Sequence, residues 1–193
     1  RDGLAIWREA LHGVLLARPE AATVGPGGRA VPAVPAGTIL LGAGAPGVLA
    51  PTRTGRLLAA LDDVLVRDAV LLSFVEGNER IEDRLVAGDT GPAIGDALAT
   101  ITDPELGRRP DPVRSAAARS VLEHAAAHAA RGLHAPSLTL LAVLAWWEGD
   151  GARAGVLVDR ALLAEPGYRL AHLVDQALRS GMPPGWVRGE CAS

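Results

Sequence analysis

The fold is decided by residues 138–166, which have the sequence LTLLAVLAWWEGDGARAGVLVDRALLAEP. A tight turn is predicted at residues 149–151, where Gly-Asp-Gly separates two apolar segments. The segments on either side repeat their apolar residues at the helical spacing of three and four. The sequence therefore predicts a helical hairpin, with its two apolar faces formed by Leu138, Leu141, Ala142 and Ala145 before the turn and by Ala154, Leu157, Val158, Ala161 and Leu162 after it.

A third helix is expected after Pro166, because proline lacks the amide donor that would continue the second one. Gly181 and the Pro183-Pro184 pair end this third helix. Small residues stand where the two hairpin helices would cross closely, a spacing typical of a tetratricopeptide unit. We therefore predict a tetratricopeptide-like helical subdomain over residues 135–182. The predicted face of its third helix consists of Leu170, Leu173, Val174 and Leu178.

Helical patterns also dominate the chain upstream of the hairpin. Asp111 is a good N-cap for a long Ala-rich helix over residues 112–131, which begins with Pro112. Asp62 and Asp63 are suited to end one helix and cap the next. We expect an all-α fold, an irregular helical bundle in a single domain over residues 1–193. Its other predicted helices lie at residues 2–18, within residues 52–75 and at residues 92–101.

Residues 21–52 differ in composition, because they hold many prolines and glycines and almost no charge. We expect a loop or insertion there, with at most one short strand at Thr38–Leu41. Residues 42–47, GAGAPG, satisfy the G-x-G-x-x-G pattern of dinucleotide-binding loops. That site needs a helix directly after the glycines, and Pro46 and Pro51 interrupt one. We interpret the match as chance, with dinucleotide binding as the alternative, and predict no cofactor.

Composition excludes several classes of function. All 19 basic residues are arginine and the formal net charge is -3, without the positive field that nucleic-acid binding requires. The longest apolar stretch, Leu138–Trp147, is about half of the ~20 residues that span a bilayer. The single cysteine, Cys191, has no internal partner and fits a reducing compartment. We therefore expect a cytoplasmic protein with a protein partner and with no nucleic-acid or membrane contact.

The C-terminal residues resemble a known family. They are LLAVLAWWEGDG at 140–151, DRAL at 159–162, EPGYRLA at 165–171 and GMPP at 181–184. Together they resemble the C-terminal half of an uncharacterised actinobacterial family, the domain of unknown function 4192. Upstream, VRDA at 66–69 resembles the family's middle helix, so that the resemblance covers residues 52–188. It implies architecture and lineage but no site, because the family has no established activity. The insertion at residues 21–52 departs from the family.

Two groups of titratable residues have alternative interpretations. His124 and His128 are four residues apart, so that both imidazoles lie on one helix face at metal-ligand spacing. We interpret them as solvated or capping side chains, and metal binding is the alternative. The acidic residues Glu76, Glu79, Glu82 and Asp83 are interpreted as a solvated face, although paired carboxylates in a pocket could perform acid–base chemistry. We predict no metal site and no catalytic residue.

Arg67 and Asp68 lie within an apolar helix, where a charge is costly unless it is paired. We expect a structural ion pair with a neighbouring helix, and a ligand-binding anchor is the alternative. The adjacent Trp146 and Trp147 point about 100° apart on a helix. One of them is expected in the core, and the other at the surface or under the C-terminal tail.

These patterns favour a non-enzymatic protein-interaction module with a groove between the hairpin and the third helix. The candidate partner-binding residues are Trp146, Trp147, Tyr168, Arg169 and His172. The alternative is a small-molecule-binding protein or enzyme subunit, with a site between residues 54–75 and 79–105 that uses Arg67, Asp68 and Glu76. A third interpretation is a homo-oligomer, a dimer formed through the apolar face from Leu4 to Leu15.

Overall fold

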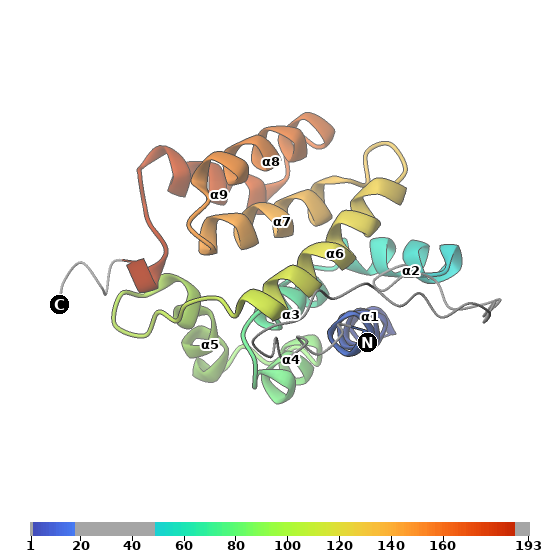
Figure 1. The fold of residues 1–193 in the computed structure, drawn as a ribbon, viewed down its shortest axis with the longest axis horizontal. Helices are drawn as coiled ribbons and strands as arrows, with labels where there is room; N and C mark the ends of the chain where they lie inside the picture. Colours follow the sequence, from blue (N-terminus) through green and yellow to red (C-terminus); the bar gives the residue numbers. More distant parts are fainter. Residues whose placement is uncertain (1, 18–48, 188–193) are drawn as a thin grey trace, which may run out of the picture.

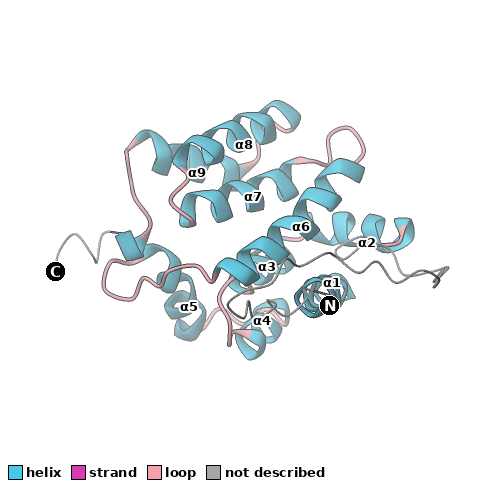
Figure 2. Cartoon of the chain, in the orientation of Figure 1, coloured by secondary structure: helices cyan, strands magenta, loops and turns pink. Residues whose placement is uncertain are grey.

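The computed structural model describes residues 2–17 and 49–187 (Figure 1). The described residues form helices and connecting loops without a strand, which confirms the predicted all-α fold (Figure 2). A short helical segment at residues 185–187 follows the last long helix. The long helices are α1 (Asp2–Leu16), α2 (Pro51–Leu61), α3 (Val64–Leu72), α4 (Glu79–Val86), α5 (Pro92–Thr102), α6 (Pro112–His128), α7 (Ala135–Trp147), α8 (Gly151–Ala164) and α9 (Arg169–Arg179).

Aspartate side chains cap the helices at the predicted places. Asp62 is the C-cap of α2, and the Asp63 carboxylate accepts a hydrogen bond from the amide of Leu65 in the first turn of α3. Asp111 caps α6 in the same way, at 2.6 Å from the Arg114 amide. Such caps satisfy amides that a helix start leaves without partners.

α7 is the central helix of the molecule. All of its residues are buried, and it packs against α2, α6, α8 and α9. Figure 1 shows it between the α8–α9 pair and the helices below it, with α6 running diagonally across the molecule. The apolar stretch Leu138–Trp147 is therefore a buried core helix, because a helix that is apolar all round is buried all round. The turn to α8 is confirmed, with Asp150 capping α8, whereas the tetratricopeptide-like geometry stays a prediction.

The apolar face of α1 packs inside the molecule. Leu4, Trp7 and Leu11 are buried in the core, and α1 contacts α2, α3 and α6. A Cβ at Gly3 would overlap the side chain of Ala60, so that only glycine allows α1 to approach α2 this closely. The chain's own helices cover Leu4 and Leu11 of this face, and the predicted dimer stays a prediction.

α9 is less buried than the two helices of the hairpin. Ala171 and Val174 are its buried residues, whereas Leu173 is 53% exposed. The predicted face was therefore correct at Val174 and wrong at Leu173. Ala171 lies three residues before Val174 and shares its buried side.

The segment after α9 folds back onto the connector between α5 and α6. The Trp186 indole donates to the Trp147 carbonyl at 2.7 Å, and Trp147 donates to the Arg108 carbonyl at 2.9 Å. A Cβ added at Gly185 would lie 2.3 Å from the Asp103 carbonyl oxygen, and one at Gly107 would lie 2.4 Å from the Trp186 amide. Because Gly107 and Gly185 have no Cβ, the backbone of the α5–α6 connector can pack directly against the backbone of the segment after α9.

Several predicted features lie outside the described residues. They include the strand at Thr38–Leu41, the glycine motif at residues 42–47 and Cys191. Most of the predicted loop at residues 21–52 lies outside them as well. At its end, Pro51 and Thr52 already belong to α2, since proline is favoured in the first turn of a helix.

Candidate functional site

The structure places Arg67, Asp68 and Tyr168 together. Arg67 donates to Asp68 Oδ1 through Nε and Nη2, at 2.9 and 2.7 Å. Its Nη1 lies 3.4 Å from the Tyr168 hydroxyl, and the guanidinium carbon lies 5.8 Å from the centroid of that ring. Burial raises the pKa of Tyr168, and the arginine opposes that shift. The ion pair therefore lies within α3, not between two helices as expected, and the arginine reaches the start of α9 through a tyrosine.

The predicted small-molecule site does not assemble around this pair. Glu76 is exposed in the loop between α3 and α4, whereas Arg67 and Asp68 turn toward Tyr168 at the start of α9. Arg67 already uses its donors on Asp68 and Tyr168. The site expected between residues 54–75 and 79–105 is therefore not formed by these three side chains.

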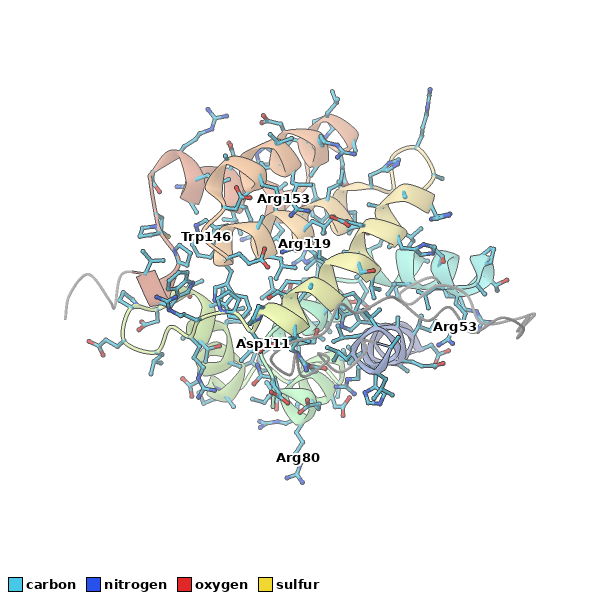
Figure 3. The ribbon with its side chains drawn as sticks, in the orientation of Figure 1. Arg53, Arg80, Asp111, Arg119, Trp146 and Arg153 are labelled. Atoms are coloured by element: carbon cyan, nitrogen blue, oxygen red, sulfur yellow. The ribbon has the colours of Figure 1, made fainter. Side chains whose placement is uncertain are left out.

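Both adjacent tryptophans are buried. Trp146 donates through Nε1 to the Met182 carbonyl at 2.8 Å, so it lies under the segment after α9 (Figure 3). Trp147 lies in the core beside the α5–α6 connector. One tryptophan was expected in the core and the other at the surface or under the C-terminal tail. Trp146 is this second tryptophan, and it lies under the segment after α9. Trp147 is enclosed, whereas Trp146 lines a hollow of about 250 Å³ together with Leu178 of α9 and the segment after it.

The other candidate partner-binding residues surround the start of α9. Arg169 and His172 are exposed, and the His172 Nε2 lies 2.7 Å from the Pro166 carbonyl oxygen. A hollow does lie between the hairpin and α9, and of the candidate residues Trp146 lines it, whereas Tyr168, Arg169 and His172 do not.

A groove does lie on the other flank of the hairpin, and we call it the α8 groove. Its volume is about 360 Å³. Leu138 and Leu141 of α7 form part of its apolar floor, and an ion pair of 2.8 Å between Arg153 and Glu123 closes one part of its rim. Figure 3 labels Arg153 on α8. The complete lining is Glu123, Ala126, Ala127, Leu138, Leu141, Arg153, Val156, Leu157 and Arg160.

The two histidines of α6 are in contact with each other. Their ring centroids are 4.2 Å apart, and the His128 Nδ1 lies 2.8 Å from the His124 carbonyl oxygen. The His124 Nε2 lies 3.2 Å from the Thr54 hydroxyl of α2. Burial, and then the neighbouring His128, lower the pKa of His124. Among the described residues, no third histidine, cysteine or carboxylate joins them to form a metal-binding group.

A second hollow, which we call the polar cavity, lies between α1, α4 and α6. Its volume is about 250 Å³. It combines two arginines, two glutamates, a histidine and a serine with an apolar wall. Its lining consists of Arg8, Leu11, His12, Leu15, Ser73, Glu79, Glu82 and Arg114.

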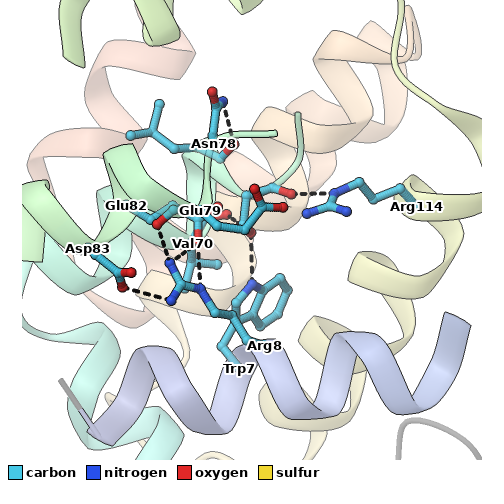
Figure 4. A network of polar contacts seen from close by, with 10 residues as sticks. Trp7, Arg8, Val70, Asn78, Glu79, Glu82, Asp83 and Arg114 are labelled. Atoms are coloured by element: carbon cyan, nitrogen blue, oxygen red, sulfur yellow. Dashed lines mark hydrogen bonds and ion pairs between the residues drawn. The ribbon is translucent and has the colours of Figure 1, made fainter. Parts of the chain in front are cut away.

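A network of hydrogen bonds forms one side of the polar cavity (Figure 4). Arg8 donates to Glu82 Oε2 at 2.8 Å, to Asp83 Oδ1 at 2.7 Å and to the Glu79 carbonyl at 2.7 Å. The Glu82 side chain is 1% exposed, and its Oε1 has no hydrogen-bond partner among the described residues. Burial raises the pKa of Glu82, and Arg8 opposes that shift. The network joins α1 to α4 through a buried carboxylate.

The other side of the cavity is built around Ser73. The Trp7 indole donates to the Ser73 hydroxyl at 2.8 Å, and the Arg114 Nε donates to the Ser73 carbonyl at 2.6 Å. Figure 4 shows Arg114 reaching this loop from α6. Residues from three helices therefore meet at the end of α3.

Sequence reasoning missed this cluster, because it placed Glu82 on a solvated face. A signal was present, since Glu82 precedes Leu85 by three residues and therefore shares the buried face of α4. Its partner Arg8 lies 74 positions away along the chain, and no local pattern connects the two.

None of the helices in the described part of the chain has the length and the apolar character needed to cross a membrane. No curated protein and no solved structure matches the chain. Residues 105–185 match the family model described as Domain of unknown function (DUF4192). The match spans α6 to α9 and includes the hairpin and the segment after α9. The predicted resemblance is therefore confirmed for the C-terminal part of the chain, which is similar to the DUF4192 family over residues 105–185.

Proposed function

We propose that this chain is a non-enzymatic protein-interaction module that binds an apolar segment of a partner protein in the α8 groove. The observation that carries the proposal is the exposure of Val156, whose side chain is 60% exposed beside the apolar floor formed by Leu138 and Leu141. Leu163, seven residues further and on the same side of α8, is 85% exposed. An apolar stripe next to a groove is typical of a protein-binding surface.

The lining of the groove favours an amphipathic helix as the partner. Ala126 and Ala127 have short side chains, which leave room for larger apolar side chains from outside. Arg160 is exposed at the rim and forms no ion pair with another described residue, whereas Arg153 already pairs with Glu123. A carboxylate on the partner would complement Arg160. We therefore expect a helix with large apolar residues on one face and an acidic residue at its edge.

The alternative of a small-molecule site at Arg67 has less support, because its guanidinium already contacts Asp68 and Tyr168. The expected partner surface at Arg169 and His172 remains a competing surface for the same function. It lies on α9, away from the α8 groove, so that substitutions can separate the two surfaces.

The test compares Val156→Glu in the groove with Leu173→Glu on α9. Both replace an exposed apolar residue with a carboxylate, so that any general effect on solubility is matched. The tagged wild type first captures partners from a lysate of a high-GC actinobacterial host. Each captured protein is then purified and titrated by calorimetry against the wild type and both variants. We expect Val156→Glu to weaken binding at least about tenfold, through a buried charge, and Leu173→Glu to leave it unchanged.

Two results would contradict the proposal. One is that no purified protein binds the wild type. The other is that the partner's affinity falls with Leu173→Glu or Arg169→Glu but not with Val156→Glu, which would assign the interaction to the α9 surface instead.

A further inference from the structure

The polar cavity contains an arginine with unused hydrogen-bond donors. The side-chain hydrogen bond of Arg114 to a described residue uses Nε, with the Ser73 carbonyl as acceptor. Its two terminal nitrogens have no acceptor among the described residues, and the side chain lines the cavity. A guanidinium with both terminal nitrogens available is suited to bind a carboxylate by two parallel hydrogen bonds. This end of the cavity is therefore suited to an anionic group.

The α4 end of the cavity carries carboxylate acceptors. The Glu79 carboxylate is exposed and forms no hydrogen bond with a described residue, whereas Glu82 Oε1 is buried without a partner. Glu82 Oε1 is closed off from the cavity, so that a donor in the cavity can reach the Glu79 carboxylate but not this oxygen. Glu79 and Glu82 are three residues apart on α4 and face the same side. This end is therefore suited to a group with several donors and a positive charge.

Arg8 cannot neutralise this end further, because Glu82, Asp83 and the Glu79 carbonyl already accept its hydrogen bonds. Three carboxylates and two guanidinium groups, those of Arg8 and Arg114, leave a formal charge of -1 on the cluster. An ammonium group supplies both the missing donors and the missing positive charge. Leu11 and Leu15 form the apolar part of the lining.

We propose that the polar cavity binds a small zwitterionic amino acid with an apolar side chain. Its carboxylate binds the terminal nitrogens of Arg114, its ammonium group donates to Glu79, and its side chain packs on Leu11 and Leu15. The volume of about 250 Å³ lies just below the ~300 Å³ at which pockets for drug-sized ligands begin. The cavity is therefore the right size for a single amino acid.

The first test uses the wild-type chain with a panel of free L-amino acids at millimolar concentration. Thermal-shift assays select the ligands, and calorimetry measures their affinity. We expect binding by leucine or another apolar member of the panel. Isopentylamine, which lacks the carboxylate, and 4-methylpentanoate, which lacks the ammonium group, should each bind at least about tenfold more weakly than leucine. Failure of every amino acid to bind, or equal binding by either analogue, would overturn the proposal.

The second test assigns the site with matched variants. Glu79→Gln removes a carboxylate from the cavity lining, whereas Glu76→Gln removes an exposed carboxylate from the preceding loop. Glu79→Gln should weaken binding at least about tenfold, and Glu76→Gln should have no effect. Arg114→Lys keeps the charge but loses the paired donors, and should also weaken binding, with thermal unfolding as the check of folding. Equal affinity of the two glutamine variants would place the ligand elsewhere and overturn the proposal.

Discussion

The α1–α4 interface and the surroundings of α7 hold the molecule together by different means. Between α1 and α4, the buried Glu82 pairs with Arg8, and the charges need partners in a fixed geometry. Around α7, apolar side chains fill the space on every side, and its two indoles need one carbonyl acceptor each. The ion pair between α1 and α4 fixes how the two helices meet, but its charges lose hydration when they are buried. The surroundings of α7 stabilise the fold mainly by removing apolar surface from water.

The largest effect is expected from Trp147→Ala, which breaks the apolar region at its centre. The indole is almost fully buried and also donates to the Arg108 carbonyl. Its removal leaves a cavity and an unpaired carbonyl, and should lower the free energy of unfolding by about 3–5 kcal/mol. Urea unfolding followed by far-UV circular dichroism measures the change. A loss below about 1 kcal/mol would mean that the region around α7 does not dominate the stability.

Arg8→Ala breaks the polar interface and should have the next largest effect. It leaves the buried Glu82 carboxylate without its main partner. Removal of one partner of a fully buried pair costs about 3–5 kcal/mol, and the 31% exposure of Arg8 reduces our expectation to about 2 kcal/mol. The matched control is Arg53→Ala, which removes an exposed arginine paired with Glu9 and should cost under about 1 kcal/mol. Equal losses in chemical unfolding would show that Glu82 is not effectively buried.

The pH dependence of stability sharpens the same comparison. The pKa of Glu82 is raised by burial above its ordinary value of 4.5, so that the folded state binds the proton more tightly than the unfolded state. Its contribution to stability is therefore fully present below pH 4.5 and is lost as the pH rises through the raised pKa. Glu82→Gln removes this titration.

The measurement is the difference in unfolding free energy between the wild type and Glu82→Gln at a series of pH values. The difference should become less favourable to the wild type as the pH rises from 4.5 toward neutrality. Glu9 and Asp89 have lowered pKa values and act in the opposite direction, but both are present in the two proteins and cancel in the difference. A difference independent of pH would contradict the raised pKa.

The smallest effect is expected from Tyr168→Phe, at the junction of α3 and α9. It removes the hydroxyl that Arg67 Nη1 approaches at 3.4 Å and keeps the ring under the guanidinium. We expect a loss below about 1 kcal/mol, because the hydrogen bond is long and the arginine keeps Asp68. Thermal unfolding against the wild type measures it. A loss of stability as large as that of Arg8→Ala would contradict this expectation and show that the contact between Arg67 and Tyr168 stabilises the fold as much as the ion pair between Arg8 and Glu82.

Local patterns predicted most of the fold. The caps at Asp63 and Asp111 and the turn at residues 149–151 depend on neighbouring residues, so that their signals lie within a few positions of each other. The depth of burial was less predictable. α7 and α9 both showed a helical apolar pattern, but only the packing of other helices around α7 made one central and the other peripheral.

The functional surfaces were harder to predict. The α8 groove depends on how α6 lies across the hairpin, which leaves Val156 exposed although its neighbour Leu157 is buried. The polar cavity depends on Arg8, Ser73 and Arg114, which come from distant parts of the chain. Arg67 was recognised as a charge in need of a partner, but its contact with Tyr168 across 101 positions was not. Contacts of this kind leave no periodic signal.

The positions of the tryptophans have an optical consequence. The chain contains four, of which Trp7 lies at the α1 interface and the others meet around the end of α7 and the segment after α9. Trp7→Phe would leave indole fluorescence only from that C-terminal group. Emission from the remaining rings would then follow detachment of the segment held by Gly107 and Gly185, while the wild-type spectrum also contains the signal from α1. Trp7 therefore reports on the α1 interface, and the other three tryptophans report on the end of α7 and the segment after α9.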